Sequence, residues 1–187
     1  MIASCSLVKF SHTGALNFCG AESMQDRSPL SKEIFRNAMA RLASAVTIIT
    51  TDGENGRHGF TASAVCSVSD EPATLLVCVN RTASTHAHLV QNGLLAINIL
   101  AHEQEELSTL FGSSRFDMQT RFASGSWRKG EIGMPVLEGA LVSLECRISL
   151  TQEIGTHSVF FVEPLCAEFT QEEASGLVWF DRAYRRA

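Results

Sequence analysis

The chain is expected to fold as a mainly β protein, a Greek-key barrel with a few α-helices at its periphery. Seven short segments rich in β-branched and aromatic residues follow one another, and Gly, Asp, Asn and Pro punctuate the connections between them. Few segments have the spacing of helices. Because so many short strands would leave exposed edges in an open sheet, a closed or nearly closed barrel is favoured.

Length and pattern predict one domain. With 187 residues, the chain is long enough to bury a continuous core. We expect the domain to cover residues 31–187. Residues 1–30 mix Ser, Gly, Cys and single apolar residues without a period of two or of 3.6, so a disordered tail is expected there. Met24 stands just before the domain, and a second hypothesis is that it is the true start.

The first expected element is an amphipathic helix. Ser31 supplies a hydroxyl that can cap its first turn. Apolar residues then recur at three- and four-residue spacing, which is the pattern of a helix with one apolar face. These residues are Ile34, Phe35, Ala38, Met39 and Leu42. The helix is predicted to end near Ala43.

The strands expected after this helix alternate with turns. They are predicted over residues 46–51, 60–67, 74–79, 94–100, 140–149, 158–168 and 177–180. Two further helices, over residues 85–91 and 103–111, interrupt the series. Residues 116–134 are expected to form a long irregular insertion. The charged segment 181–186 is expected to be a solvated end.

Composition excludes several classes of function. A net charge of −5 lacks the basic excess that nucleic-acid binding needs. No run approaches the roughly 20 apolar residues of a membrane-spanning helix, so no membrane association is expected. The six cysteines include no C-x-x-C pair. They indicate reduced residues in a cytoplasmic protein, and Cys66 and Cys78 are expected to pack in the core.

The segment 59–80 suggests a site for a flat ligand with a polar edge. Small hydroxyl side chains stand there beside two apolar, strand-like runs. The chain has neither a G-x-x-x-x-G-K-[ST] loop nor a G-x-G-x-x-G turn, which excludes the standard α/β nucleotide sites. What remains are hydroxyl and amide groups, with Arg81 suited to a phosphate. Composition alone favours the plainer interpretation that strands and turns are rich in Ser and Thr.

Several ordered motifs together carry a family resemblance. They are FRNAMARLASAVTIITTDGENGRHGFTASAVCSVSDEP, LLVCVNRTAS, LLAINIL, AHEQEELSTLFG, PVLEGALVSLECRI, IGTHSVFFVE and GLVWFDRAY. This series resembles the flavin reductase-like family, the reductase components of two-component flavin-dependent monooxygenases. Within that family it looks most like the reductase component of 4-hydroxyphenylacetate 3-monooxygenase. The resemblance covers residues 34–184 and outweighs the plainer interpretation.

The resemblance implies a fold and an activity. The fold would be an FMN-binding split β-barrel, usually a homodimer. The enzyme would be an NAD(P)H:flavin oxidoreductase that reduces diffusible FMN or FAD with NADH or NADPH. The reduced flavin would then leave by diffusion for a separate monooxygenase. Hydride transfer needs two stacked rings, so positioning by the protein would matter more than acid–base groups.

The same resemblance implies the residues of the site. The expected flavin-binding residues are Thr61, Ala62, Ser63, Ser67, Val68, Asn80, Arg81, Ser84, Thr85, Asn98, Arg182 and Tyr184. Ser67 and Val68 would meet the polar edge of the flavin ring, and Ser84 and Thr85 would hold the ribityl and phosphate groups. His157, in the G-T-H motif, would face the nicotinamide as the catalytic residue. No metal is expected.

Some alternatives stay open at this point. His86 and His88 replace less polar residues of the family near the expected phosphate loop, which leaves the choice between FMN and FAD open. We interpret both as solvated loop residues rather than metal ligands. A non-catalytic FMN-binding module for electron transfer or storage is the alternative function. An oxidase acting on a vitamin B6 phosphate ranks last, because no dense Arg/Lys cluster is present to bind its substrate.

Overall fold

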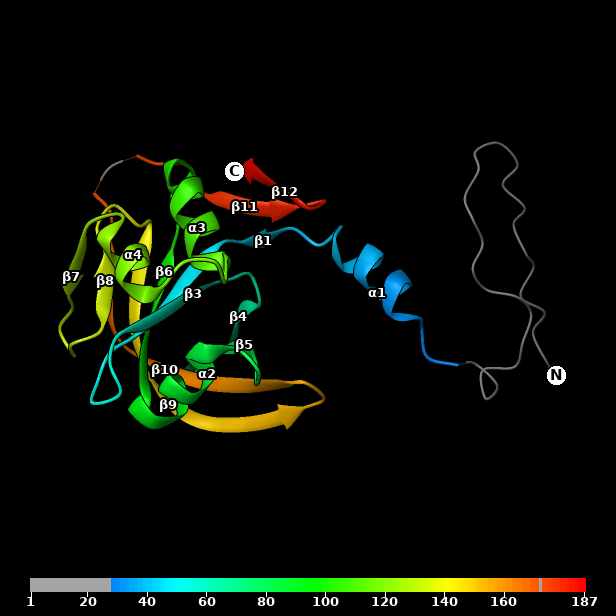
Figure 1. The fold of residues 1–187 in the computed structure, drawn as a ribbon, viewed down its shortest axis with the longest axis horizontal. Coiled ribbons are helices and arrows are strands. Elements are labelled where there is room, and N and C mark those ends of the chain that lie inside the picture. Colours follow the sequence, from blue (N-terminus) through cyan, green and yellow to red (C-terminus); the bar gives the residue numbers. More distant parts are fainter. Residues whose placement is uncertain (1–27, 172) are drawn as a thin grey trace.

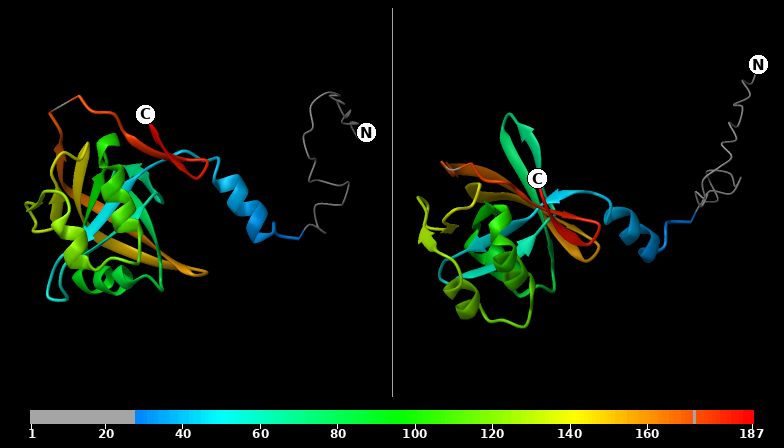
Figure 2. Two further views of the ribbon diagram at one scale, coloured as in Figure 1. Left: turned by 45° about the horizontal axis from the view of Figure 1, so that its top comes forward. Right: turned by 90° about the horizontal axis from the view of Figure 1, so that it is seen from above.

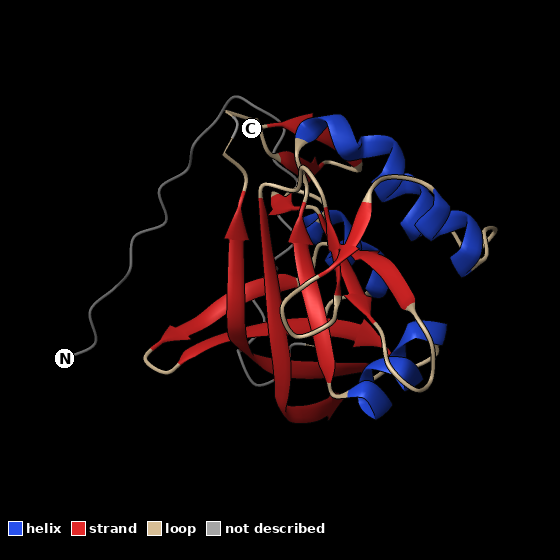
Figure 3. Ribbon diagram, turned by 90° about the vertical axis from the view of Figure 1, so that its left-hand side faces the viewer, coloured by secondary structure: helices blue, strands red, loops and turns tan. Residues whose placement is uncertain are grey.

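The computed structural model describes residues 28–171 and 173–187. Its centre is a seven-stranded antiparallel sheet with strand order β3-β2-β6-β9-β10-β5-β4, which curls into a barrel (Figures 1 and 3). Its strands are β2 (Thr47–Thr51), β3 (His58–Ala62), β4 (Val65–Asp70), β5 (Ala73–Asn80), β6 (Leu94–Ile99), β9 (Val142–Ile154) and β10 (His157–Phe169). Because β3 and β4 follow each other yet pair with β2 and β5 respectively, the barrel is split between them, at Ser63 and Ala64.

Two smaller sheets and several helices complete the fold. The sheets are β1 (Ser44–Ala45) with β11 (Leu177–Phe180) and β12 (Ala183–Arg186), and β7 (Trp127–Lys129) with β8 (Pro135–Leu137). The helices are α1 (Lys32–Met39), α2 (Ser84–Asn92), the 3₁₀ helix η2 (His102–Gln104), α3 (Glu105–Gly112) and α4 (Met118–Ala123). Helix α1 projects away from the barrel, on the side opposite β7 and β8 (Figures 1 and 2).

The core follows the alternation of side chains along the strands. Val77 and Val79 of β5 point inward and are buried, whereas Leu76 and Cys78, which alternate with them, point outward. Inside the barrel they pack with Leu95, Ile97 and Phe160, among others. A second apolar cluster joins the sheet to α3 and β11 and contains Val46, Ile48, Leu100, Phe111 and Leu177. The first cluster fills the barrel, and the second fixes α3 and β11 to it.

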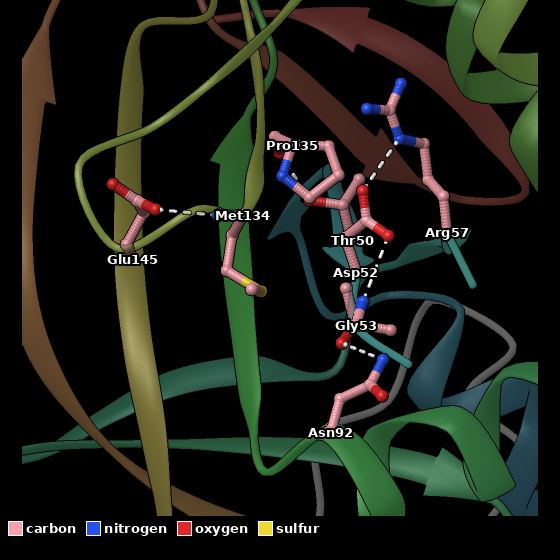
Figure 4. Close-up of polar contacts among 9 residues, drawn as sticks. Thr50, Asp52, Gly53, Arg57, Asn92, Met134, Pro135 and Glu145 are labelled. Atoms are coloured by element: carbon pink, nitrogen blue, oxygen red, sulfur yellow. Dashed lines mark hydrogen bonds and ion pairs between the residues drawn. The ribbon is translucent and has the colours of Figure 1, made fainter. Parts of the chain in front are cut away.

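Buried polar side chains tie the loops to the barrel. The Thr50 hydroxyl donates to the Pro135 carbonyl over 2.6 Å. The Glu145 carboxylate accepts from the backbone N–H groups of Glu131, Ile132 and Met134. Figure 4 shows the bond from Met134. A carboxylate that accepts three such bonds can stay buried, because the bonds replace those it would make with water. These contacts hold residues 130–135 against the barrel.

Much of the predicted fold is confirmed. The chain is mainly β with few helices, and Ser31 caps α1 by accepting from the Ile34 N–H. Three predictions were wrong. Residues 60–67 form two strands because β3 and β4 have different partners. The insertion 116–134 contains α4, β7 and the connection to β8. The supposed solvated end contains β12, which pairs with β11. The tail predicted over residues 1–30 lies, up to residue 27, outside the described residues.

Candidate functional site

The break between β3 and β4 opens a groove at Ser63. This residue borders three adjoining hollows, with volumes of about 730, 200 and 400 Å³. The first lies under α1 beside Trp179 and Arg182. The second is lined by Val46, Thr61, Gly112, Trp179 and Tyr184. The third runs past Cys66, Leu76 and Cys78 on the outer side of β4 and β5. Together, these hollows are large enough to hold a nucleotide-sized ligand.

An aromatic pair forms one wall of the groove. Trp179 and Tyr184 meet edge to face, with their ring centres 4.9 Å apart. The Tyr184 hydroxyl lies 2.9 Å from the Ser108 Oγ of α3. The Thr61 hydroxyl donates to the Ser108 carbonyl over 2.5 Å. Ser108 of α3 thus connects Tyr184 of β12 to Thr61 of β3, and these two bonds fix the position of the wall.

The turn between β11 and β12 fastens α1 to the groove. Asp181 and Arg182 have φ values of 50° and 59°, a conformation that side chains other than glycine rarely adopt. The Asp181 N–H donates to the Ala40 carbonyl over 2.7 Å, and Arg182 donates to the Asn37 amide oxygen over 2.6 Å. Arg41 pairs with the Asp181 carboxylate at 3.2 Å. These bonds stabilise the strained turn and place the Arg182 guanidinium at the groove rim.

A second group of predicted residues meets at the far end of β5. Asn80, its last residue, pairs in register with His157, the first residue of β10. Arg81 donates from its backbone to the Thr156 carbonyl and from its side chain to the Gly155 carbonyl. The Asn80 amide oxygen accepts from the N–H and the hydroxyl of Thr82. The chain turns there into α2 and leaves the Ser84 side chain exposed.

The two groups belong to one surface. Leu76, Cys78 and Asn80 alternate with the buried residues of β5 and therefore share its outer face. Cys78 lines the third hollow, and its N–H donates to the Ala64 carbonyl in the break. The groove at Ser63 thus leads along β5 toward Asn80 and His157. Polar groups lie at both ends, with an apolar stretch between them.

Other predicted residues are engaged elsewhere. The Asn98 side chain is fully buried and donates to the Ile48 carbonyl and the Thr50 hydroxyl. Its oxygen accepts from the Leu137 N–H and the Ser143 hydroxyl, so the geometry gives its predicted flavin contact no support. The Ala62 side chain packs in the core. The Thr85 hydroxyl is buried and bonds to His58.

Ser67 and Val68 lie at a distance from the phosphate end of the expected site. Ser67 pairs with Leu75, five residues before Asn80, which along a strand is about 16 Å. A register shift between Ser67 and Ser69 breaks the ladder at Val68, whose side chain is exposed. A ligand that touched both Ser67 and Asn80 would have to extend along most of β5.

Arg81, the positive charge at the far end of the groove, already has a partner. Arg81 forms an ion pair with Glu153 at 2.5 Å, both side chains being largely exposed. An exposed pair of this kind is weak, so the guanidinium can exchange Glu153 for a ligand phosphate.

Burial, and next the neighbouring Cys66, raise the pKa of the Cys78 thiol. Both cysteines line the groove and Cys66 is exposed, which corrects the prediction that they pack in the core.

Helix α2 carries the two histidines that had been interpreted as solvated loop residues, and that interpretation was wrong. His86 Nε2 lies 2.8 Å from the Ser158 Oγ. The His88 ring stacks on His58, with ring centres 4.1 Å apart. Among residues 28–171 and 173–187, no three His, Cys, Asp or Glu side chains are grouped to hold a metal ion.

Sequence reasoning missed several residues that shape the site. Arg121 of α4 is buried and donates to the carbonyls of Phe116, Gly59, Phe111 and Ser113. It thereby fixes α3 and α4 against β3. The signal for α4 was present, because Asp117 caps it by accepting from the Thr120 N–H over 2.7 Å. Trp179 lines the first hollow, and nothing local in the sequence places it on the groove.

Within the described part of the chain, no helix has the length and apolar character needed to cross a membrane. The longest α-helix, α2, has nine residues.

Comparison with known proteins agrees with this geometry. The profile of the "Flavin reductase like domain" family matches residues 39–187, which include both ends of the groove. A protein of Stutzerimonas stutzeri named FMN reductase (NADH) RutF is 51% identical over 160 residues. This match covers 86% of the present chain and 91% of the relative.

Solved structures show the same fold. The flavin reductase component BorF of a bacterial two-component tryptophan halogenase matches with a TM-score of 0.77 and 30% identity, over 83% of this chain and 98% of BorF. The NADH:FAD oxidoreductase SgcE6 of Streptomyces globisporus, solved with NAD and FAD fragments, matches with a TM-score of 0.77 and 28% identity. That match covers 83% of this chain and 93% of SgcE6.

Proposed function

The chain belongs to the flavin reductase-like family, and from this premise we propose that it is an NAD(P)H:flavin oxidoreductase. It reduces diffusible FMN or FAD with NADH and supplies the reduced flavin to a partner flavin-dependent monooxygenase. The observation that carries the proposal is the groove at Ser63, which joins an aromatic wall to polar groups at both ends. Apart from residues 32–37 of α1, its lining lies inside the matched residues. A tricyclic ring needs a flat apolar wall, and its ribityl phosphate needs polar partners.

The flavin is proposed to lie along the groove from the break toward α2. Thr61 and Ser63 line the hollows beside Trp179 and Tyr184, where hydroxyls can bond the edge of a ring. The ribityl phosphate then extends to Asn80, Arg81 and Ser84. Arg81 supplies the positive charge there once it is released from Glu153. Arg182 marks the opposite end, under α1.

His157 is proposed to bind the nicotinamide. Its side chain is exposed at the start of β10, and Nδ1 lies 2.9 Å from the Thr156 hydroxyl. With Nδ1 held there, Nε2 is directed away from Thr156 and can bond the carboxamide of NADH. Bound flavin accepts the hydride directly, so the chain needs no proton relay for this step. The task of His157 is to orient the nicotinamide over the flavin.

The enzyme is proposed to work as a homodimer. The outer face of β5, β10 and β9 carries an apolar row, in which Leu76, Phe161 and Leu150 lie side by side in register. Leu150 and Ile154 are 58% and 59% exposed in the single chain. Exposed apolar side chains gathered on one sheet face are typical of a subunit interface. The third hollow lies on the same face, so a second copy packed there would cover the open side of the groove.

A change of charge on this face tests the dimer. Leu150→Glu should convert dimer to monomer, as measured by sedimentation at fixed protein concentration. Thr151→Glu, which adds the same charge at the neighbouring residue, should leave the dimer intact, because neighbouring strand residues point to opposite faces. A wild-type protein that sediments as a monomer would reject the proposed dimer.

The cytoplasm is the proposed location. Cys66, Cys78, Cys146 and Cys166 are all free thiols. Reduced cysteines are the normal state in a reducing compartment.

The supply of free reduced flavin distinguishes this function from that of a fixed electron carrier. The protein is mixed with NADH and excess FMN under anaerobic conditions, and the solution is passed through a membrane that retains protein. A flavin reductase that releases its product leaves stoichiometric reduced flavin in the filtrate. Reduced flavin confined to the retained protein, in the amount of one per chain, would support the FMN-binding carrier instead.

A further inference from the structure

Helix α2 is attached to the barrel along its length through side chains of β2 and β3. In its first turn, the Thr85 hydroxyl lies 2.9 Å from His58 Nδ1. One turn later, His88 stacks on the same His58 ring, with ring centres 4.1 Å apart and an angle of 24° between the rings. At the last residue of the helix, Asn92, which Figure 4 labels, donates its side-chain N–H to the Thr51 hydroxyl over 3.0 Å. His58 therefore contacts the helix at two points.

The contact with Thr85 acts on the first turn of α2. Thr85 is only 2% exposed, and its neighbour Ser84 points to solvent at the proposed phosphate site. The turn has no side-chain cap, since Ala83 occupies the N-cap position. With no cap oxygen, two side-chain contacts fix this turn to the sheet: Thr85 bonds His58 of β3, and His86 bonds Ser158 of β10. A shift of Thr85 would move Ser84 and the first N–H groups of the helix.

The surroundings of His58 favour its neutral form. From α2 it faces His88, and from α4 it faces Arg121, which donates to the carbonyl of the adjacent Gly59. From β2 it faces Thr51, its partner in register, and α3 contributes the Phe111 ring beside Gly59. Of these neighbours, only His88 and Arg121 can carry a charge, and both are basic. Burial, then His88, then Arg121 lower the pKa of His58 from 6.5 to about 4.

We propose that His58 is a positioning residue that holds the first turn of α2 in the geometry that binds the flavin phosphate, and that its protonation releases this turn. The proposal rests on the proposed function, since it concerns how that site recognises FMN. A protonated His58 would still reach Thr85, but it would stand as a cation between His88 and Arg121. The neutral ring is the state that lets the helix pack closely.

The direction of the pH effect follows from this arrangement. In the held state the pKa of His58 is about 4, and in a released, hydrated state it returns toward 6.5. Protons therefore bind the released state more tightly. The hold is complete above about pH 6.5 and weakens as the pH falls from there toward 4. Phosphate recognition should weaken over the same range.

The experiment compares FMN with riboflavin, which has the same ring and ribityl chain but no phosphate. The ratio of the riboflavin KM to the FMN KM is measured in steady-state NADH oxidation between about pH 7.5 and about pH 5. In the wild type this ratio should fall by about fivefold or more as the pH is lowered. In His58→Asn, which keeps a hydrogen-bonding group near the Nδ1 position but cannot titrate, it should change by less than about twofold beyond buffer effects.

Two features of the design isolate His58. The second ionisation of the FMN phosphate, near pH 6, affects every variant alike. His102→Gln is the matched control, because His102 of η2 also has a buried Nδ1 with no bonding partner among the described residues, as His88 has. This variant should keep the wild-type pH profile. A purely structural role of His58 would change the KM for FMN and riboflavin together and leave their ratio constant.

A second variant serves if His58→Asn does not fold. Thr85→Val removes the hydroxyl at nearly constant shape, and it should raise the KM for FMN already at neutral pH with little change for riboflavin. An identical pH profile of the ratio in the wild type and in His58→Asn would overturn the inference while leaving the flavin reductase intact. Equal KM values for both flavins at neutral pH would reject the phosphate site itself. Absence of NADH oxidation with any flavin would reject the proposed function.

Discussion

His157 and Asn80 are direct partners across the antiparallel pair of β10 and β5. The sequence places them 77 positions apart, yet the register brings the proposed nicotinamide residue beside the proposed ribityl and phosphate residues. Their side chains share the outer face of the sheet on which the third hollow lies. The groups proposed to bind the two reactants of the hydride transfer therefore lie on one surface.

Replacing His157 by Ala should affect NADH more than flavin. The side chain is exposed and bonds only its neighbour Thr156 among the contacts described, so the fold should be unchanged. Loss of one hydrogen bond to the nicotinamide, about 1 to 1.5 kcal/mol, should lower kcat/KM for NADH by about five- to twelvefold. Steady-state kinetics at saturating FMN measure this. An unchanged kcat and KM for NADH would remove His157 from the site.

Ser84→Glu should impair the binding of FMN. The new carboxylate would lie at the first turn of α2 and repel the flavin phosphate, which should raise the Kd for FMN by at least about fivefold. Ser84→Gln has nearly the same size without the charge and separates repulsion from bulk. Fluorescence titration with FMN and riboflavin reports both effects. Normal FMN affinity in Ser84→Glu would place the phosphate elsewhere.

Ser63→Phe should fill the groove. Ser63 borders all three hollows, so an aromatic side chain there would occupy the space proposed for the flavin ring. FMN and riboflavin should both lose at least about tenfold in affinity, because the ring is common to both. Ser114→Phe, an equal change on an exposed loop, is the control. The prediction fails if Ser63→Phe binds both flavins as the wild type does.

Asn98→Ala should destabilise the fold. The amide makes four hydrogen bonds, to β2, to residue 137 and to β9, and it is fully buried. Its removal leaves several of these groups without partners, which should cost about 2 to 3 kcal/mol of unfolding free energy. Urea unfolding measures the loss. At low temperature, where the variant is folded, its flavin affinity should stay normal, and a specific loss of flavin binding would restore Asn98 to the ligand site.

Local patterns in the sequence predicted most elements, and two of the three failures share a cause. Residues 60–67 have continuous strand propensity, and only the exchange of pairing partners at Ser63 divides them. Segment 183–186 is too short and charged to be recognised without its partner β11. In both cases the decisive information is which strand lies alongside, and propensity does not contain it.

Only the part of the candidate site that lies in one local motif could be predicted from sequence patterns. Asn80, Arg81 and Ser84 are consecutive or nearly so, and a local motif identified them. The wall formed by Trp179 and Tyr184 depends on β12 packing against α3 through Ser108. The role of His58 depends on α2 lying over β3. Contacts between distant segments of this kind follow from tertiary packing.

The central claim is that free flavin is a substrate of this chain, and the rate of NADH oxidation as a function of added FMN tests it most directly. Purified protein stripped of flavin should oxidise NADH at a negligible rate, and the rate should rise and saturate as FMN or FAD is added. A rate that stays at the uncatalysed level at every flavin concentration, with folded protein, would contradict the account.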